Sequence, residues 1–345
     1  MLPKKESYNV CVVGAGAVGV EILRVLRQRK FPVAKLTLLA RSARTLSVDG
    51  QSYPVQQVSP EAFDGQEIVL FAGTEGEKGA AVTYAKEAIR RGAVCVDNGA
   101  DFRMDPAVPL VIPEVNPADA AQHKGLIANP NCSTIQMVVA LAPIHRKLKV
   151  RRVIVSTYQA ASGAGSKATE ALLAETRAAA EQKPLPASDA LPQRLALNVF
   201  PHIGPFQELG YTSEEWKMVK ETQKILHDSS IAITATAVRV PVLDGHSESV
   251  YFETEKPATV QELKELLRKS PGIRFVEEPA YPMPIDAAHR DEVFVGRLRP
   301  DPTVKNAFTC WVVSDNLRKG AALNAVQIAE LLVQGAENPK TPSRV

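Results

Sequence analysis

The sequence lacks several features that define whole classes of protein. Its 345 residues include no apolar run long enough to span a bilayer, and the polar start is not a secretory leader. Four scattered cysteines are too few for a disulfide framework, and they form no CxxC pair, so we expect no metal site. The net charge of +3 comes without a block of lysine or arginine. We therefore expect a soluble cytoplasmic protein that binds neither membrane nor nucleic acid.

Strand-then-helix units alternate through the first third of the chain. Short β-branched runs, each followed by a turn and a helical pattern, are typical of a parallel sheet in an α/β fold. After about residue 150 the β-rich runs lengthen and fewer helices separate them, which favours a mixed sheet. The fold class is therefore predicted as α/β, with an N-terminal Rossmann-like parallel-sheet domain and an α+β domain that contains a mixed sheet.

The chain length predicts about two domains. The first is placed at 1–131 with 320–345, because the apolar helix expected over Gly320–Val333 would pack back on it, and the second is placed at 132–319. Strands are predicted at Asn9–Val13, Leu36–Ala40, Glu67–Ala72, Ala93–Asp97, Leu110–Ile112, Leu126–Ala128, Val153–Tyr158, Ile231–Val242, Ser247–Glu255 and Phe308–Ser314.

A glycine-rich turn follows the first predicted strand. Gly14-Ala15-Gly16-Ala17-Val18-Gly19 leads directly into a helical pattern, which is the context in which GxGxxG indicates a dinucleotide site. A tight turn without a ligand is the alternative. The next strand ends at Arg41-Ser42-Ala43-Arg44 and has no acidic residue there, which suits a 2′-phosphate and favours NADP. A solvated basic turn is the alternative here.

One cysteine has a setting that suits reaction. Asn129-Pro130-Asn131-Cys132-Ser133-Thr134 places Cys132 before a helical run, where the helix N-terminus favours thiolate over thiol. Position alone leaves a quiet residue near a helix start equally open. The other cysteines, which lie in apolar runs and read as buried, are Cys11, Cys95 and Cys310.

Two polar segments of the second half are candidates for a site. His246 is expected in the turn between two strands, where it could reach a cleft, although a loop histidine is more often a solvent-exposed bystander. Thr212-Ser213-Glu214-Glu215 has the form of a capping box, in which Glu215 is structural and Glu214 is free to pair with Lys217. From the sequence alone an ordinary surface ion pair is the better interpretation of Glu214 and Lys217.

Taken in order, the motifs resemble one family, aspartate-semialdehyde dehydrogenase, over nearly the whole chain. The segments that carry the resemblance are 129–134, Tyr158-Gln159-Ala160-Ala161-Ser162-Gly163-Ala164-Gly165, Glu214-Glu215-Trp216-Lys217, Arg239 before Val240-Pro241, Gly245-His246 and 315–322. The resemblance implies reduction of L-aspartyl-4-phosphate to L-aspartate-4-semialdehyde with NADPH and release of phosphate, toward lysine, threonine and methionine. It also implies a catalytic and dimerisation role for the second domain, in a homodimer or homotetramer.

The resemblance assigns roles residue by residue. Cys132 would form the thioester and Gln159 would orient the substrate, while His246 would serve as acid and base. Asn131, with amides at the helix start, would stabilise the oxyanion. The expected substrate contacts are Arg239 for the carboxylate, Glu214 for the ammonium, and Lys217 and Arg103 for phosphate. The expected cofactor contacts are Gly14, Gly16, Ala17, Val18, Gly19, Arg41, Ser42, Ser162, Gly163 and Asn316.

Three positions depart from the family pattern, all on the cofactor side: the glycine turn is one residue shorter, Gly99 stands in place of serine, and Arg44 in place of glycine. Two alternatives to the family's activity stay open. Another acyl-phosphate reductase, such as N-acetylglutamyl-phosphate reductase, would use the same thioester chemistry, although its cysteine turn typically reads Pro-Gly-Cys-Tyr. A catalytically silent paralogue that binds a nucleotide or a partner is the non-enzymatic alternative.

Overall fold

A computed structural model describes residues 1–73, 76 and 79–334 of the chain. The contacts divide it into two compact units, which are described separately. Unit 1 consists of Met1–Asn131 and the segment that starts at Ala321, and unit 2 consists of Cys132–Gly320. The division into domains expected from the sequence, with breaks after residues 131 and 319, stays a prediction, and its last eleven residues lie outside the described ones.

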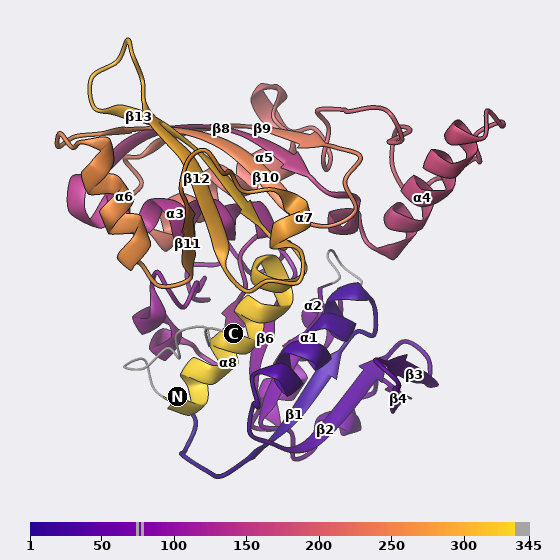
Figure 1. Cartoon of the computed structure of the whole chain (residues 1–345). Helices are drawn as coiled ribbons and strands as arrows, with labels where there is room; N and C mark the ends of the chain where they lie inside the picture. The colour runs from indigo at the N-terminus through magenta and orange to yellow at the C-terminus, as the bar shows by residue number, and fades with distance from the viewer. Residues whose placement is uncertain (74–75, 77–78, 335–345) are drawn as a thin grey trace. The chain divides into compact units, whose positions relative to one another are not determined.

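Unit 1 is built on a seven-stranded sheet in the order β3-β4-β2-β1-β5-β6-β7, in which every pair except β3/β4 is parallel. This confirms the predicted Rossmann-like sheet. Its strands are β1 Tyr8–Val13, β2 Val33–Ala40, β3 Arg44–Val48, β4 Gln51–Gln57, β5 Ile68–Phe71, β6 Val94–Asp97 and β7 Leu126–Ala128. Its helices are α1 Ala17–Gln28, α2 Ala80–Arg90 and α8 Leu323–Gln334, with 3₁₀ turns η1 Pro60–Phe63 and η2 Pro117–Gln122 (Figure 1).

One predicted strand of unit 1 is wrong. The apolar run Leu110–Ile112 is buried but makes only an isolated bridge, between Leu110 and Ala128. Prolines at 109 and 113 flank the run. Because proline has no N–H to donate, it interrupts a ladder of strand hydrogen bonds, and the run stays irregular although it belongs to the core.

The last helix of the described chain closes the core of unit 1. Every residue of α8 from Leu323 to Val333 is buried, and its apolar side chains pack in one cluster with those of α1, β1 and β2. The helix begins three residues later than predicted, because Arg318–Ala322 form a π-helical turn (η5) before it. The amide of Leu2 donates to the carbonyl of Leu332 at 2.9 Å, so both ends of the described chain are fixed in unit 1. No helix among the described residues is long and apolar enough to cross a membrane.

Unit 2 is built on a six-stranded mixed sheet in the order β11-β12-β13-β10-β8-β9, as the sequence predicts. The β8/β9 and β11/β12 pairs are parallel and the others antiparallel. Its strands are β8 Val150–Gln159, β9 Ala232–Arg239, β10 His246–Thr254, β11 Ile273–Val276, β12 Val293–Pro300 and β13 Ala307–Ser314. Its helices are α3 Cys132–Leu148, α4 Ser166–Ala180, α5 Ser213–Ile225, α6 Val260–Lys269 and α7 Pro284–Ala287, with 3₁₀ turns η3 Ala161–Ala164 and η4 Glu208–Gly210.

One face of this sheet is covered by helices. α3 packs on four strands and also contacts α5 and α6, so the three helices form a layer. Along β10 the even-numbered side chains from His246 to Thr254 are all buried, whereas most odd-numbered ones are partly exposed. The even-numbered side chains therefore point toward the helices. In contrast, α4 extends away from the sheet of its unit (Figure 1) and buries only a few of its side chains.

Candidate active site

The register of the sheet brings three predicted site residues into one row. Gln159 at the end of β8 pairs with Arg239 at the end of β9. On the other side of β8, Ser247 pairs with Tyr158, which puts His246 level with Gln159. Successive residues of a strand point to opposite faces, so residues level with one another on adjacent strands share a face. Arg239, Gln159 and His246 therefore lie side by side on the face that the helices cover.

Cys132 is the first residue of α3 and is half-buried, while the other three cysteines are buried. Burial raises the pKa of the Cys11 and Cys310 thiols to about 12, and the pKa of Cys95 is also raised. Only Cys132 therefore combines access with the positive end of a helix dipole, which favours thiolate. The contrast between the cysteines that the sequence predicts is confirmed.

His246 is not in a turn, contrary to the prediction, but is the first residue of β10 and is fully buried. The turn ends one residue earlier, at Gly245, whose φ of +90° is a conformation that glycine adopts readily. The amide of Ala160 donates to Nδ1 of His246 at 3.0 Å. Because Nδ1 accepts a hydrogen bond, a neutral imidazole carries its proton on Nε2.

The electrostatic surroundings keep His246 neutral. Burial and the positive charge of Arg239 hold the pKa of His246 well below its ordinary value of 6.5. Nε2 has no hydrogen-bond partner among the residues that the structure describes. The imidazole is therefore a neutral donor whose N–H is available to another molecule.

Arg239 is fixed by the same backbone residue as His246. Its Nη1 donates to the carbonyl of Ala160 at 2.6 Å, so one alanine orients both side chains through its main chain. Burial lowers the pKa of Arg239, while the charges of Glu214 and Cys132 act in the opposite direction. The guanidinium is thus within electrostatic range of both acidic groups. The role of Ala160 is one that side-chain motifs could not have revealed.

Gly163 lies beside both of these side chains. A Cβ at this position would be 2.9 Å from Cε1 of His246 and 3.0 Å from Nη1 of Arg239, closer than real Cβ contacts. The absence of a side chain therefore allows both functional groups to lie close to the backbone of Gly163.

Helix α5 contributes Glu214 to the same group. The predicted capping box is present: Thr212 accepts from the amide of Glu215 at 3.4 Å, and the Glu215 carboxylate accepts from the amide of Thr212 at 2.7 Å. Glu214 accepts a hydrogen bond from Nε2 of Gln159 at 3.2 Å and lies 3.6 Å from Nζ of Lys217. Because Glu214 is buried, the surface ion pair favoured by the sequence alone is wrong.

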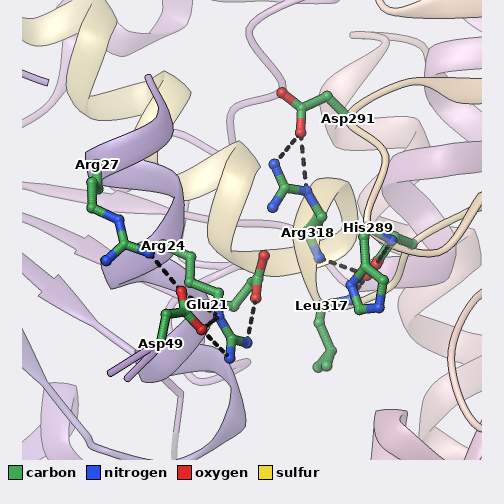
Figure 2. Close-up of polar contacts among 9 residues, drawn as sticks. Glu21, Arg24, Arg27, Asp49, His289, Asp291, Leu317 and Arg318 are labelled. Atoms are coloured by element: carbon green, nitrogen blue, oxygen red, sulfur yellow. Dashed lines mark hydrogen bonds and ion pairs between the residues drawn. The ribbon is translucent and has the colours of Figure 1, made fainter. Parts of the chain in front are cut away.

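Ser162 and Asn316, both predicted as cofactor contacts, are bonded to each other. Nδ2 of Asn316 donates to Oγ of Ser162 at 3.0 Å, and Oδ1 accepts from the amide of Gly245 at 2.9 Å. The polar turn that carries Asn316 is itself held by Asp315. This carboxylate accepts from the amides of Leu317, Arg318 and His289. The side chain of Arg318 in turn pairs with Asp291 (Figure 2).

In unit 1, the glycine turn has the geometry of a dinucleotide site. Gly14 has a φ of +115°, and a Cβ on Gly19 would lie 1.9 Å from the carbonyl oxygen of Gly14. Gly16 is the N-cap of α1, and a Cβ there would meet nothing within 4 Å. The turn is therefore tight on the protein side and open in front of the helix N-terminus, where Ala17 and Val18 start the helix and a pyrophosphate would bind.

The basic segment after β2 borders this turn. Arg41 and Ser42 are exposed beyond the end of the strand, and Nη2 of Arg44 donates to the carbonyl of Ala15 at 3.3 Å. Arg24 and Arg27 of α1 are instead engaged by Asp49, which follows β3 (Figure 2). The residues around the turn thus fit a dinucleotide that carries a 2′-phosphate.

Arg103 and Asn131 are both buried in unit 1. Nε of Arg103 donates to the carbonyl of Asn129 at 2.9 Å and Nη2 to the carbonyl of Asn98 at 2.8 Å. Arg103 is therefore no surface arginine, and it supports the turn that leads to Cys132. Within residues 1–73, 76 and 79–334, no group of three or more His, Cys, Asp and Glu residues is placed to hold a metal ion.

Two family models match the chain in succession. The NAD-binding domain of semialdehyde dehydrogenases matches residues 9–123, and their dimerisation domain matches residues 141–319. Aspartate-semialdehyde dehydrogenase of Aquifex aeolicus is 51% identical over 338 residues, which are 95% of this chain and 98% of that protein. The Bacillus subtilis protein of that name is 48% identical over 343 residues, with the same two shares.

Solved structures agree with these relatives. Aspartate semialdehyde dehydrogenase II of Vibrio cholerae, solved in complex with ASA, matches with a TM-score of 0.92 and 42% identity over 96% of this chain and 99% of its own. The Candida albicans enzyme, solved with NADP, matches with a TM-score of 0.73 and 26% identity over 96% and 99%. Because the agreement extends over nearly the full length of relatives this similar, the chain belongs to the aspartate-semialdehyde dehydrogenase family.

Proposed function

We propose that the chain reduces L-aspartyl-4-phosphate to L-aspartate-4-semialdehyde with NADPH and releases phosphate, a step of lysine, threonine and methionine biosynthesis. The observation that carries this proposal is the position of Cys132. It is the one half-buried thiol, at a helix N-terminus, within electrostatic range of Arg239 in the row that also holds Gln159 and His246.

The first half-reaction transfers the acyl group to sulfur. The Cys132 thiolate attacks the acyl carbon of the substrate, so a C–S bond forms and the C–O bond to phosphate breaks. The proton of the thiol leaves with phosphate. Amides at the start of α3 and the side chain of Asn131 stabilise the oxyanion, and Nε2–H of His246 is a further donor.

The second half-reaction reduces the thioester. When bound, the nicotinamide cofactor supplies a hydride for the thioester carbon. Nε2–H of His246 donates a hydrogen bond to the carbonyl oxygen and stabilises the negative charge that hydride addition places on it. The alkoxide then collapses to the aldehyde, which breaks the C–S bond and releases the Cys132 thiolate. A neutral imidazole suits this role at neutral pH because Nε2 keeps its proton throughout and only donates a hydrogen bond.

The charges of the site are complementary to those of the proposed substrate. The α-carboxylate suits the Arg239 guanidinium, and the α-ammonium suits Glu214, which Gln159 also contacts. Lys217 and Arg103 are the proposed phosphate ligands. N-acetylglutamyl-phosphate, whose amine is blocked, would leave the buried Glu214 without a cationic partner, and the relatives likewise favour the aspartate substrate.

The cofactor in this proposal is NADP, held at the glycine turn by Gly14, Gly16, Ala17, Val18 and Gly19 and at its 2′-phosphate by Arg41 and Ser42. Ser162, Gly163 and Asn316 are the proposed contacts of unit 2. The match to a dimerisation domain supports an oligomer, which we propose is a homodimer or homotetramer. A cytoplasmic location, where amino-acid biosynthesis takes place, completes the proposal.

Oxidation of L-aspartate-4-semialdehyde tests the function directly. Absorbance at the nicotinamide band is followed with and without inorganic phosphate, in parallel with NADP and NAD, for the natural chain and for Cys132→Ala. We expect phosphate-dependent reduction of NADP by the natural chain and none by the variant. Turnover that needs no phosphate, or that survives the loss of Cys132, would refute the thioester route.

A further inference from the structure

A buried acid lies directly beneath the catalytic row. Glu248 follows His246 at the next inward position of β10, opposite Thr157 on β8 and Val312 on β13. It is fully buried, and neither carboxyl oxygen has a hydrogen-bond partner among the residues that the structure describes. An unpartnered buried carboxyl is costly, so its presence at this place calls for an explanation.

The group that faces Glu248 belongs to the helix of the nucleophile. Gln136 lies one helical turn after Cys132 on α3, on the same side of the helix. Its Oε1 accepts a hydrogen bond from Oγ of Ser314 at 2.7 Å, and Ser314 pairs with His246 in the sheet. Nε2 of Gln136 is buried without a partner and lies beside the Glu248 carboxyl. The first turns of α3 are thus tied to the catalytic row through Gln136.

The groups around Glu248 favour its uncharged form. Burial raises the pKa of Glu248 well above 4.5, and the charge of Glu214 on α5 raises it further, against the opposing effect of Gln136. Cys310 on β13 also faces it, and Glu248 in turn helps to raise the pKa of that thiol. On its own strand, the neighbouring His246 is neutral. None of these groups brings a positive charge that would stabilise a buried carboxylate.

We propose that Glu248 is a positioning residue that acts as a neutral acid: it pairs with the side-chain amide of Gln136 and thereby holds the first turn of α3, with Cys132, against the catalytic row. This inference rests on the proposed function of Cys132. A protonated carboxyl matches a primary amide, because its carbonyl oxygen accepts from Nε2 while its hydroxyl donates to the second lone pair of Oε1. A carboxylate has no proton to donate and would face Oε1 with like partial charge.

Two variants separate this role from simple occupancy of the core. Glu248→Gln keeps the size and both kinds of hydrogen-bonding atom, so we expect a kcat within about twofold of the natural chain. Glu248→Leu fills the same space without polar atoms. Because small displacements of a reacting group are costly, we expect kcat to fall by about tenfold or more with KM little changed. Iodoacetamide should alkylate Cys132 correspondingly more slowly in the leucine variant.

The pH dependence of stability gives a readout that is independent of activity. A carboxyl with a raised folded-state pKa contributes stability that is fully present below its ordinary value of 4.5 and is lost as pH rises through the folded value. The Tm of the natural chain, measured relative to that of Glu248→Gln, should therefore fall progressively as pH rises above 4.5. Val250→Thr, a polar change at the next inward position, is the control, with a lower Tm and an unchanged kcat expected.

Each part of the proposal has an outcome that overturns it. If Glu248→Leu keeps the kcat and alkylation rate of the natural chain, Glu248 does not position Cys132. If kcat falls as much in Glu248→Gln as in the leucine variant, or if the Tm of Glu248→Gln has the same pH slope as that of the natural chain, Glu248 does not act as a neutral acid. Failure of the proposed function is distinguishable from both, since it would appear as turnover that persists in Cys132→Ala.

Discussion

At the scale of single residues, the most restrictive position of the site is a glycine. A methyl group on Gly163 would come within 3.0 Å of both His246 and Arg239, two buried side chains that Ala160 holds in place. Gly163→Ala should therefore displace one of them and lower kcat/KM by about tenfold or more. Thermal unfolding, measured alongside, should shift by only a few degrees. An unchanged kcat/KM would show that the close approach of His246 and Arg239 to Gly163 is not needed.

Arg44 gives a prediction about the cofactor. Its guanidinium donates to Ala15 within the glycine turn, so it lies where a second positive charge would meet the 2′-phosphate. Arg44→Gly, which restores the glycine usual in the family, should weaken NADPH binding by about tenfold, because an exposed charged hydrogen bond contributes about 1.4 kcal/mol or somewhat more. Titration by cofactor fluorescence measures this, with NADH as the internal control. Equal loss for both cofactors would instead indicate a role for Arg44 in shaping the turn.

Much of the candidate site could be predicted because its residues carry local signals. The turn before Cys132 marks a helix start, and Thr212 with Glu215 marks another, which left Glu214 available. The burial of His246 and Glu214 could not be predicted, because it depends on the helix layer that covers the sheet. Ala160 lies within the motif at 158–165, but its role could not be predicted, because its contribution comes entirely from its main chain.

At the scale of elements, two helices with the same N-terminal motif allow a matched comparison. The capping box of Thr212 begins α5, which carries Glu214, and that of Thr259 begins α6, which carries no residue of the site. Thr212→Ala and Thr259→Ala should each lower the free energy of unfolding by about 1 kcal/mol, the former somewhat more because Thr212 is buried.

Only the α5 variant should affect the substrate. Loss of the Thr212 cap frees the first turn that aims Glu214 at Gln159, so KM for the semialdehyde should rise severalfold while the α6 variant keeps its KM. Denaturant unfolding and steady-state kinetics on the two variants provide the measurement. A rise in KM of the same size for Thr259→Ala would mean that general loosening, and not the placement of Glu214, is responsible.

The elements that the sequence predicted are those with long or strongly apolar signals, such as β1, β10 and β13. Four strands were missed: β3, β4, β11 and β12. No buried run marks β3, β4 or β11, whose side chains are mostly exposed or partly exposed. β12 starts with four buried residues, but Gly296 limits its apolar run to three. The run at 110–112 was predicted as a strand because its apolar residues are buried, but flanking prolines prevent pairing. An apolar run therefore indicates that a segment is buried, but it does not indicate that the segment pairs with a strand.

At the scale of the whole molecule, three histidines with lowered pKa values make stability depend on pH. The pKa values of His246, His145 and His123 are all lowered, in each case chiefly by burial. A histidine with a lowered folded-state pKa binds fewer protons in the folded chain than in the unfolded one as pH falls below 6.5. The free energy of unfolding should therefore decrease from about pH 6.5 downward.

Denaturant titrations at several pH values between about 5 and 7 test this dependence. His246→Gln, which cannot titrate, should show a flatter dependence than the natural chain, since His246 is the most deeply buried of the three. If the free energy of unfolding of the variant depends on pH in the same way as that of the natural chain, the dependence comes from the other two histidines.

The order of the chain has a consequence for how the protein is made. The core of unit 1 takes its first strands from the start of the chain and its closing helix, α8, from beyond unit 2. All of unit 2 must therefore be synthesised before that core can be completed. Until then the apolar surface of β1 and its neighbouring strands stays uncovered. We expect nascent chains arrested before Leu323 to protect the α3 region from protease while the N-terminal strands remain susceptible.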